Sequence, residues 1–155
     1  MSRVDFMEEA VRLAAESVRR GGGPFGAVVV REGIIVGRGW NRVTEARDPT
    51  AHAEIEAIRD ACGNLGSHQL DGCELYASSE PCPMCLGAIY WARPDAVYFA
   101  TGRADAARAG FDDAFIYEEI GRLPDDRRIR MLRIVVCDAT EPFRLWNAKR
   151  DRVEY

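Results

Sequence analysis

The chain has 155 residues and a formal net charge of -4, with 47% hydrophobic and 30% charged residues. This composition is ordinary for a globular protein of one domain. The acidic balance argues against a protein built mainly to hold nucleic acid, which needs a basic face. We find neither a signal-peptide pattern nor an apolar run near the roughly 20 residues of a membrane span. We therefore expect a cytoplasmic protein that has no membrane partner and whose five cysteines are thiols or metal ligands.

Hydrophobic periodicity and turn residues predict an alternation of helices and strands along the chain. The first helix ends at three glycines, which form a stop signal, the second has Thr50 as its expected N-cap, and the third opens at Pro81. The expected helices are residues 2–20, 48–64, 81–92, 104–109 and 141–151. The expected strands are residues 25–30, 34–40, 73–78, 96–100 and 131–137.

This order of elements indicates one α/β domain that spans residues 1–155. The first two strands form a hairpin, and the last three strands, which are joined by helices, can run parallel. The prediction is therefore a mixed sheet of five strands with helices on both faces.

Two cysteines and one histidine carry the chemistry of the sequence. Cys82 and Cys85 are three residues apart at the predicted start of a helix, so both sulfur atoms point the same way. The partial positive charge of a helix N-terminus stabilises thiolates, the form of cysteine that binds metal. His52 supplies an imidazole at the start of another predicted helix. Three protein ligands leave a fourth position for water, which is the arrangement of a catalytic zinc.

A Cys-x-x-Cys that follows a strand is also typical of a thioredoxin-like redox pair, and by itself it leaves zinc and redox chemistry open. The segment HAE, from His52 to Glu54, favours zinc because a redox pair has no need of it. Together the segments form H-x-E…P-C-x-x-C, the signature of zinc nucleobase deaminases. Zinc would lower the pKa of a water so that hydroxide exists near neutral pH. Glu54 would then carry protons from the water to the ring nitrogen and the departing amine.

The pattern resembles the cytidine deaminase superfamily over nearly the whole chain. Residues 36–61 look as much like tRNA adenosine deaminases as like free-base deaminases. Residues 79–100 and 105–120, SEPCPMCLGAIYWARPDAVYFA and DAARAGFDDAFIYEEI, resemble bacterial guanine deaminases, as does the end of the chain at Tyr155. The resemblance implies a three-layer α/β/α fold, one zinc ion per chain and a small purine substrate. It also implies a homodimer in which a segment of about residues 141–155 is exchanged between the subunits.

The same resemblance implies a role for each matching residue. His52, Cys82 and Cys85 would hold zinc as hydroxide attacks C2 of guanine, and Glu54 would be the proton shuttle. Asp113 would meet the guanine N–H groups and act as a second proton carrier. The other expected purine contacts are Phe25, Asn41, the backbone of Ala53, Trp91 and Tyr155. Adenine lacks the paired N1–H and N2–H₂ donor edge of guanine, so a buried carboxylate would reject it.

Other interpretations of these residues stay open. Asp113 is also placed to cap the following helix, Trp91 to join the core, and Asn41 to be only a turn residue. The remaining cysteines, Cys62, Cys73 and Cys137, are predicted to be small core side chains, and His68 an exposed loop residue.

Alternative functions also stay open. Guanosine, cytosine or an amino-triazine is an alternative substrate, and a tRNA adenosine deaminase is a further interpretation. A zinc-binding module without activity is the alternative from another class. The intact Glu54 argues against that module, because a structural site gains nothing from an unliganded carboxylate beside the metal.

Overall fold

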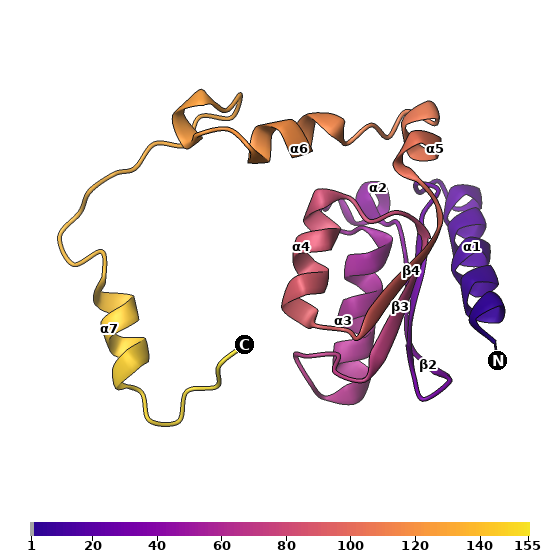
Figure 1. The fold of residues 1–155 in the computed structure, drawn as a ribbon, viewed down its shortest axis with the longest axis horizontal. Coiled ribbons are helices and arrows are strands. Elements are labelled where there is room, and N and C mark those ends of the chain that lie inside the picture. Colours follow the sequence, from indigo (N-terminus) through magenta and orange to yellow (C-terminus); the bar gives the residue numbers. More distant parts are fainter. Residues whose placement is uncertain (1) are drawn as a thin grey trace. The chain divides into compact units, whose positions relative to one another are not determined.

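The computed structural model describes residues 2–155 and divides the chain into two units, with the boundary between Asp113 and Ala114 (Figure 1). The first unit contains α1 (Arg3–Arg19), β1 (Gly26–Arg31), β2 (Ile34–Trp40), α2 (Val43–Ala46), α3 (Ala53–Leu65), β3 (Cys73–Ser79), α4 (Pro83–Ala92), β4 (Ala96–Thr101) and α5 (Arg103–Arg108). The second contains α6 (Ala114–Ile120), the 3₁₀ turn η1 (Pro124–Asp126) and α7 (Glu141–Ala148).

The four strands of the first unit form one mixed sheet in the order β2-β1-β3-β4. β1 is antiparallel to both of its neighbours, whereas β3 and β4 are parallel and are joined by the crossover helix α4. Because β3 and β4 run in the same direction, their carboxyl ends meet at one edge of the sheet, where Ser79 pairs with Thr101. The segments that follow these two strands therefore start as neighbours.

Helices cover both faces of this sheet, which confirms the three-layer α/β/α fold (Figure 1). Ala27 and Val29 of β1 pack with α3 and α4 in one core cluster, whereas Val28 and Val30 pack with α1 in the other. This alternation follows from the opposite directions of successive side chains in a strand. The cluster on the α3 and α4 side thus holds the two helices that position the predicted ligands His52, Cys82 and Cys85.

Two glycines of β2 let α3 lie unusually close to the sheet. A Cβ atom at Gly39 would lie 2.1 Å from the carbonyl oxygen of Ala53, and one at Gly37 would lie 2.5 Å from that of Ala57. A larger residue at either position would push the helix away. The glycines therefore fix the first turn of α3, and with it His52 and Glu54, against the strand.

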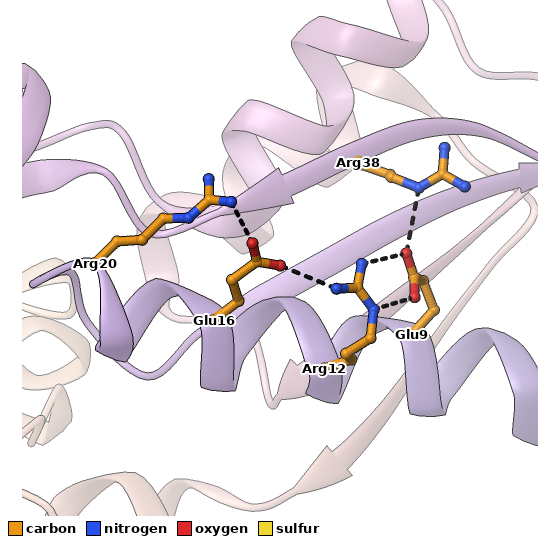
Figure 2. A network of polar contacts seen from close by, with 5 residues as sticks. All are labelled: Glu9, Arg12, Glu16, Arg20 and Arg38. Carbon is orange, nitrogen blue, oxygen red and sulfur yellow. Dashed lines mark hydrogen bonds and ion pairs between the residues drawn. The ribbon is translucent and has the colours of Figure 1, made fainter.

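Charged side chains on α1 form a network with β2 (Figure 2). The Glu9 carboxylate accepts hydrogen bonds from Arg12 at 2.7 and 2.9 Å and from Nε of Arg38 at 3.3 Å. Arg12 also donates to Glu16 at 2.9 Å, and Glu16 in turn pairs with Arg20. The hydrogen bond from Arg12 lowers the pKa of the Glu9 carboxyl. Exposed pairs of this kind contribute at most about 1 kcal/mol each, so apolar packing does more to hold α1 in place.

The predicted fifth strand, residues 131–137, is wrong: the described residues contain four strands, and this segment has no regular secondary structure. A strand needs a neighbour for its backbone N–H and C=O groups and a covered apolar face. In the single chain Ile134 and Val135 are 83% and 80% exposed. The apolar residues of this segment led to the prediction of a strand, but the sequence does not specify a neighbouring strand with which it could pair.

No residue of Ala114–Tyr155 is buried. The last predicted helix is confirmed in shorter form as α7, and its Phe143 is 69% exposed.

The predictions for single cysteines have different outcomes. Cys137 is exposed, so its assignment to the core is wrong, whereas Cys73 is fully buried and Cys62 packs against the core as predicted. His68 is exposed, as expected for a loop residue. None of the helices within residues 2–155 combines the length and apolarity needed to cross a membrane.

Candidate active site

The three predicted metal ligands come from the N-termini of two helices that lie on the same face of the sheet. His52 is the N-cap of α3 in place of the expected Thr50, and Cys82 is the N-cap of α4, which therefore begins after the expected start at Pro81. Neither cap side chain bonds to its own helix backbone. Cys85 follows in the first turn of α4 and is fully buried. Both cap side chains therefore remain available for a metal ion.

These ligands have the separations that a zinc ion requires. Nδ1 of His52 lies 3.5 Å from Sγ of Cys82 and 3.5 Å from Sγ of Cys85. A tetrahedral zinc with Zn–S bonds of about 2.3 Å and Zn–N bonds of about 2.0 Å places nitrogen and sulfur about 3.5 Å apart. One imidazole and two thiols are also ligands that zinc favours. Among the described residues 2–155, His52, Cys82 and Cys85 form a group of three potential metal ligands whose ligand atoms all lie within 4.8 Å of one another.

The pKa values of the two cysteine thiols shift in opposite directions. The hydrogen bond from Cys85, with a further contribution from His52, lowers the pKa of the Cys82 thiol to about 4. The same bond to Cys82, together with burial, raises the pKa of Cys85. The Cys82 hydrogen bond also raises the pKa of His52. Zinc held here would require the loss of the Cys85 proton, because both sulfurs must be thiolates to act as ligands.

Glu54 lies in the first turn of α3, two residues after His52, and is only 7% exposed. Burial is the largest influence on its carboxyl group and raises its pKa. Its carboxylate is not part of the three-residue ligand group. A buried, unliganded carboxyl whose pKa lies above the ordinary value suits proton transfer near neutral pH.

Asn41 directly follows β2 and is buried, and its side-chain oxygen is held by two backbone donors. Oδ1 accepts hydrogen bonds from the N–H groups of Gly23, at 3.2 Å, and Val43, at 3.4 Å. The backbone N–H of Asn41 also donates to the carbonyl of Phe25 at 3.0 Å. Asn41 thus has the turn role that the sequence left open. The same contacts fix the direction of its amide and leave Nδ2 as the donor that could meet a substrate.

Asp113 is held by a residue that the sequence interpretation missed. Its Oδ1 accepts a hydrogen bond from Nε of Arg103 at 3.1 Å, and its side chain is 18% exposed. Phe111, also missed, places its ring edge-on to that of Phe25, with 5.0 Å between the centroids and 87° between the planes. Phe25 itself packs against the core cluster below α3 and α4. Phe111 lies in the segment of residues 105–120 that resembles bacterial guanine deaminases, whereas no pattern marked Arg103.

The other predicted purine contacts lie at different places in the structure. Ala53 is the first residue of α3 and is buried, and the first N–H groups of a helix have no acceptor within it. Trp91 is near the end of α4 and is 63% exposed, so the alternative that it belongs to the core is wrong. Tyr155 belongs to the second unit and is 68% exposed.

The fold and the metal site agree with a known family of zinc enzymes. Residues 1–101 match the family described as the cytidine and deoxycytidylate deaminase zinc-binding region. The chain belongs to this family, and its His52, Cys82 and Cys85 are positioned to bind the zinc ion.

Individual relatives narrow the comparison. The guanine deaminase of Bacillus subtilis (strain 168) is 53% identical over 156 residues, which cover 100% of both chains. The tRNA-specific adenosine deaminase of Aquifex aeolicus is 43% identical over 100 residues, which cover 64% of this chain and 66% of the relative. The similarity to a guanine deaminase thus extends through the second unit, whereas the similarity to this tRNA deaminase covers about two thirds of the chain.

Solved structures of guanine deaminases resemble this chain as well. The crystal structure of the Bacillus subtilis guanine deaminase superimposes with a TM-score of 0.98 and 52% identity, covering 100% of this chain and 99% of that one. A guanine deaminase from Nitrosomonas europaea gives a TM-score of 0.70 at 35% identity, covering 73% of this chain and 66% of that one.

Proposed function

We propose that this chain catalyses the hydrolytic deamination of guanine, in which guanine and water give xanthine and ammonia. The observation that supports hydrolytic deamination is the grouping of His52, Cys82 and Cys85 as metal ligands, with the buried carboxyl of Glu54 two residues after His52. The match to a guanine deaminase over the whole chain supports guanine as the substrate.

The proposed chemistry divides between the metal and one carboxyl group. Zinc, when held by His52, Cys82 and Cys85, lowers the pKa of a water molecule so that it can act as a nucleophile near neutral pH. As the oxygen of this water bonds to C2 of guanine, Glu54 accepts its proton. Glu54 gives this proton to the ring nitrogen. It then takes the second proton from the oxygen now bonded to C2 and gives it to the exocyclic amine, so that the C2–N bond breaks, C2=O forms and ammonia leaves. The raised pKa of Glu54 helps it to hold each proton between these steps.

Substrate recognition in this proposal uses groups of opposite hydrogen-bonding character. Nδ2 of Asn41 and the backbone N–H of Ala53 donate to acceptor atoms of the purine. Asp113 accepts from the N–H groups of guanine and serves as a second proton carrier. Phe25 and Trp91 pack on the ring. The two hydrogen bonds that fix Oδ1 of Asn41 support its part, because they orient the donor nitrogen before a substrate arrives.

The proposal includes a homodimer in which about residues 141–155 pass to the second copy. The exposed apolar side chains of the second unit support it, among them Ile134, Val135 and Phe143. Apolar surface of this kind is typical of protein interfaces, and a second copy offers the same surface in return. In this arrangement Tyr155 closes the purine pocket of the partner. The cytoplasm is the proposed compartment, because its reducing conditions keep the two thiol ligands free of disulfides.

An ammonia-release assay on the zinc-loaded protein tests this function directly. The substrates are guanine, guanosine, cytosine, an amino-triazine, adenine and a tRNA anticodon stem-loop. We expect guanine to be the preferred substrate by a wide margin. Release from the stem-loop alone would instead establish a tRNA adenosine deaminase, and no release from any substrate would favour a zinc-binding module without activity.

A further inference from the structure

Arg103 links the strand ends beside the metal site to the loop that carries Asp113. It is the first residue of α5, and Gly102, the N-cap of that helix, separates it from the end of β4. Its backbone N–H donates to Oε2 of Glu80 at 3.4 Å, and its side-chain Nε donates to Oδ1 of Asp113 at 3.1 Å. We propose that Arg103 is a positioning residue that orients the Asp113 carboxylate for guanine. The inference rests on the proposed function, since it assigns a support to one of its substrate-binding residues.

The backbone of Arg103 is fixed to the metal side of the site. Glu80 stands between the end of β3 and the Pro81–Cys82 segment, and its own N–H donates to the carbonyl of Thr101 at 2.8 Å. Because β3 and β4 end at the same edge of the sheet, this contact joins the segment that leads to Cys82 to the segment that leads to Arg103. The guanidinium therefore extends from a fixed point on the scaffold.

Asp113, in contrast, lies in a stretch without regular secondary structure between α5 and α6. A carboxylate in such a loop would be free to rotate unless something held it. Phe111 ties the loop to Phe25 through their edge-on ring contact, and its N–H donates to the carbonyl of Ala106 at 2.9 Å. These contacts fix the backbone of the loop, and Arg103 is the residue that fixes the direction of the carboxylate itself.

The geometry of the Arg103–Asp113 contact leaves the carboxylate able to accept hydrogen bonds from the N–H groups of guanine. A carboxylate has two oxygens and about four lone-pair directions, and the hydrogen bond from Nε of Arg103 engages Oδ1 of Asp113. Oδ2 can then be aimed at the paired N1–H and N2–H₂ donors of guanine. The side chains of Arg103 and Asp113 are 38% and 18% exposed, and ion pairs near the surface contribute little to stability. The contribution of Arg103 is therefore to geometry, and its loss should leave the fold intact.

A double-mutant cycle tests the proposal with the zinc-loaded full chain and guanine as the probe. The variants are Arg103→Met, Asp113→Ala and the double variant, with Arg103→Lys as the conservative change. Arg108→Met is the matched control, because Arg108 is an exposed arginine of the same short helix that pairs with Asp105. For each protein the measurements are kcat and KM for guanine, zinc content and the midpoint of thermal unfolding.

We expect Arg103→Met to lower kcat/KM at least about tenfold, because small misplacements of a binding group can cost up to about a hundredfold. We expect this loss to disappear in the Asp113→Ala background, Arg103→Lys to recover part of it, and zinc content and the unfolding midpoint to stay unchanged. The inference would be overturned, and the proposed function left standing, by any of three results. The losses of kcat/KM in the double variant could be additive, the loss in Arg103→Met could be no larger than that in Arg108→Met, or it could be accompanied by a loss of zinc or of thermal stability. A wild-type chain without activity on guanine would overturn the proposed function, and this inference with it.

Discussion

Nδ1 of His52 lies 3.5 Å from Sγ of Cys82, although 30 positions separate the two residues in the sequence. The contact exists because α3 and α4 lie on the same face of the sheet and begin with these two residues as N-caps. The partial positive charge of both helix starts favours the thiolate form of the cysteines. The distance therefore describes a metal site prepared by the fold.

Removal of the metal should abolish activity. We expect about one zinc per chain, loss of ammonia release after chelation, and recovery on addition of zinc. Cys85→Ser should lower zinc content and activity together. Cys62→Ala is the control, because Cys62 packs beside the core and is not a ligand, so its zinc content should match that of the wild type. Metal analysis and the ammonia assay check this, and an active protein without metal would refute the assignment.

Glu54→Gln should separate catalysis from metal binding. The amide keeps the size of the side chain but cannot carry the proton, so we expect turnover to fall about 10²- to 10⁴-fold. Zinc content and the unfolding midpoint should change little. The control is Glu56→Gln in the same turn of α3, since Glu56 forms an ion pair with Arg59 on the helix surface. If Glu54→Gln retained wild-type turnover, another group would have to move the proton.

Gly39→Ala should destabilise the protein and damage the metal site. The added methyl group would come within 2.1 Å of the Ala53 carbonyl oxygen, so the first turn of α3 must move. We expect a loss of about 1–3 kcal/mol in the free energy of unfolding, together with weaker zinc binding. Gly63→Ala in α3 is the control, because a Cβ atom there meets nothing within 4 Å. That change should stabilise the protein by about 0.5–1 kcal/mol, as measured by urea unfolding.

Tyr76 should make stability depend on pH in the alkaline range. Burial, followed by its hydrogen bond to Glu74, raises the pKa of Tyr76 from 10.0 to about 12. The folded state thus favours the neutral phenol. Its contribution is fully present below pH 10 and is lost as the pH rises toward 12. Urea unfolding between pH 9 and 12 should show this decline, and Tyr76→Phe should make it shallower. Equal slopes in the two proteins would contradict the prediction.

Complementation between inactive chains tests the exchanged segment. One chain carries Glu54→Gln, and the other lacks Val153–Tyr155, so we expect each to be nearly inactive alone. If the segment passes between copies, a co-expressed mixed dimer should regain activity, because the intact end of the first chain closes the intact site of the second. Mass measurement should show the dimer. Activity that stays absent in a mixed dimer would place each segment over the site of its own chain.

The metal site was largely predictable from the sequence. The residues within HAE are close together in the sequence, as are those within PCPMC. The start of a helix presents its cap and first-turn side chains in a way that depends little on the rest of the fold. The order of elements up to β4 and the three-layer arrangement were also predictable, because each segment carries its own periodicity and turn signals.

The tertiary structure decided what depended on partners distant in the sequence. The apolar run at residues 131–137 predicted a strand, but pairing requires an edge that the run cannot specify, and the segment remains exposed in the single chain. The ion pair between Arg103 and Asp113 was equally hidden, because an arginine after a strand has many possible acceptors until the following loop is placed. The sequence by itself determined the ligands and the reaction they serve, since these follow from residue type and local spacing. The ion pair that holds the Asp113 carboxylate depends on how two strand ends and a loop meet, and only the folded chain shows it.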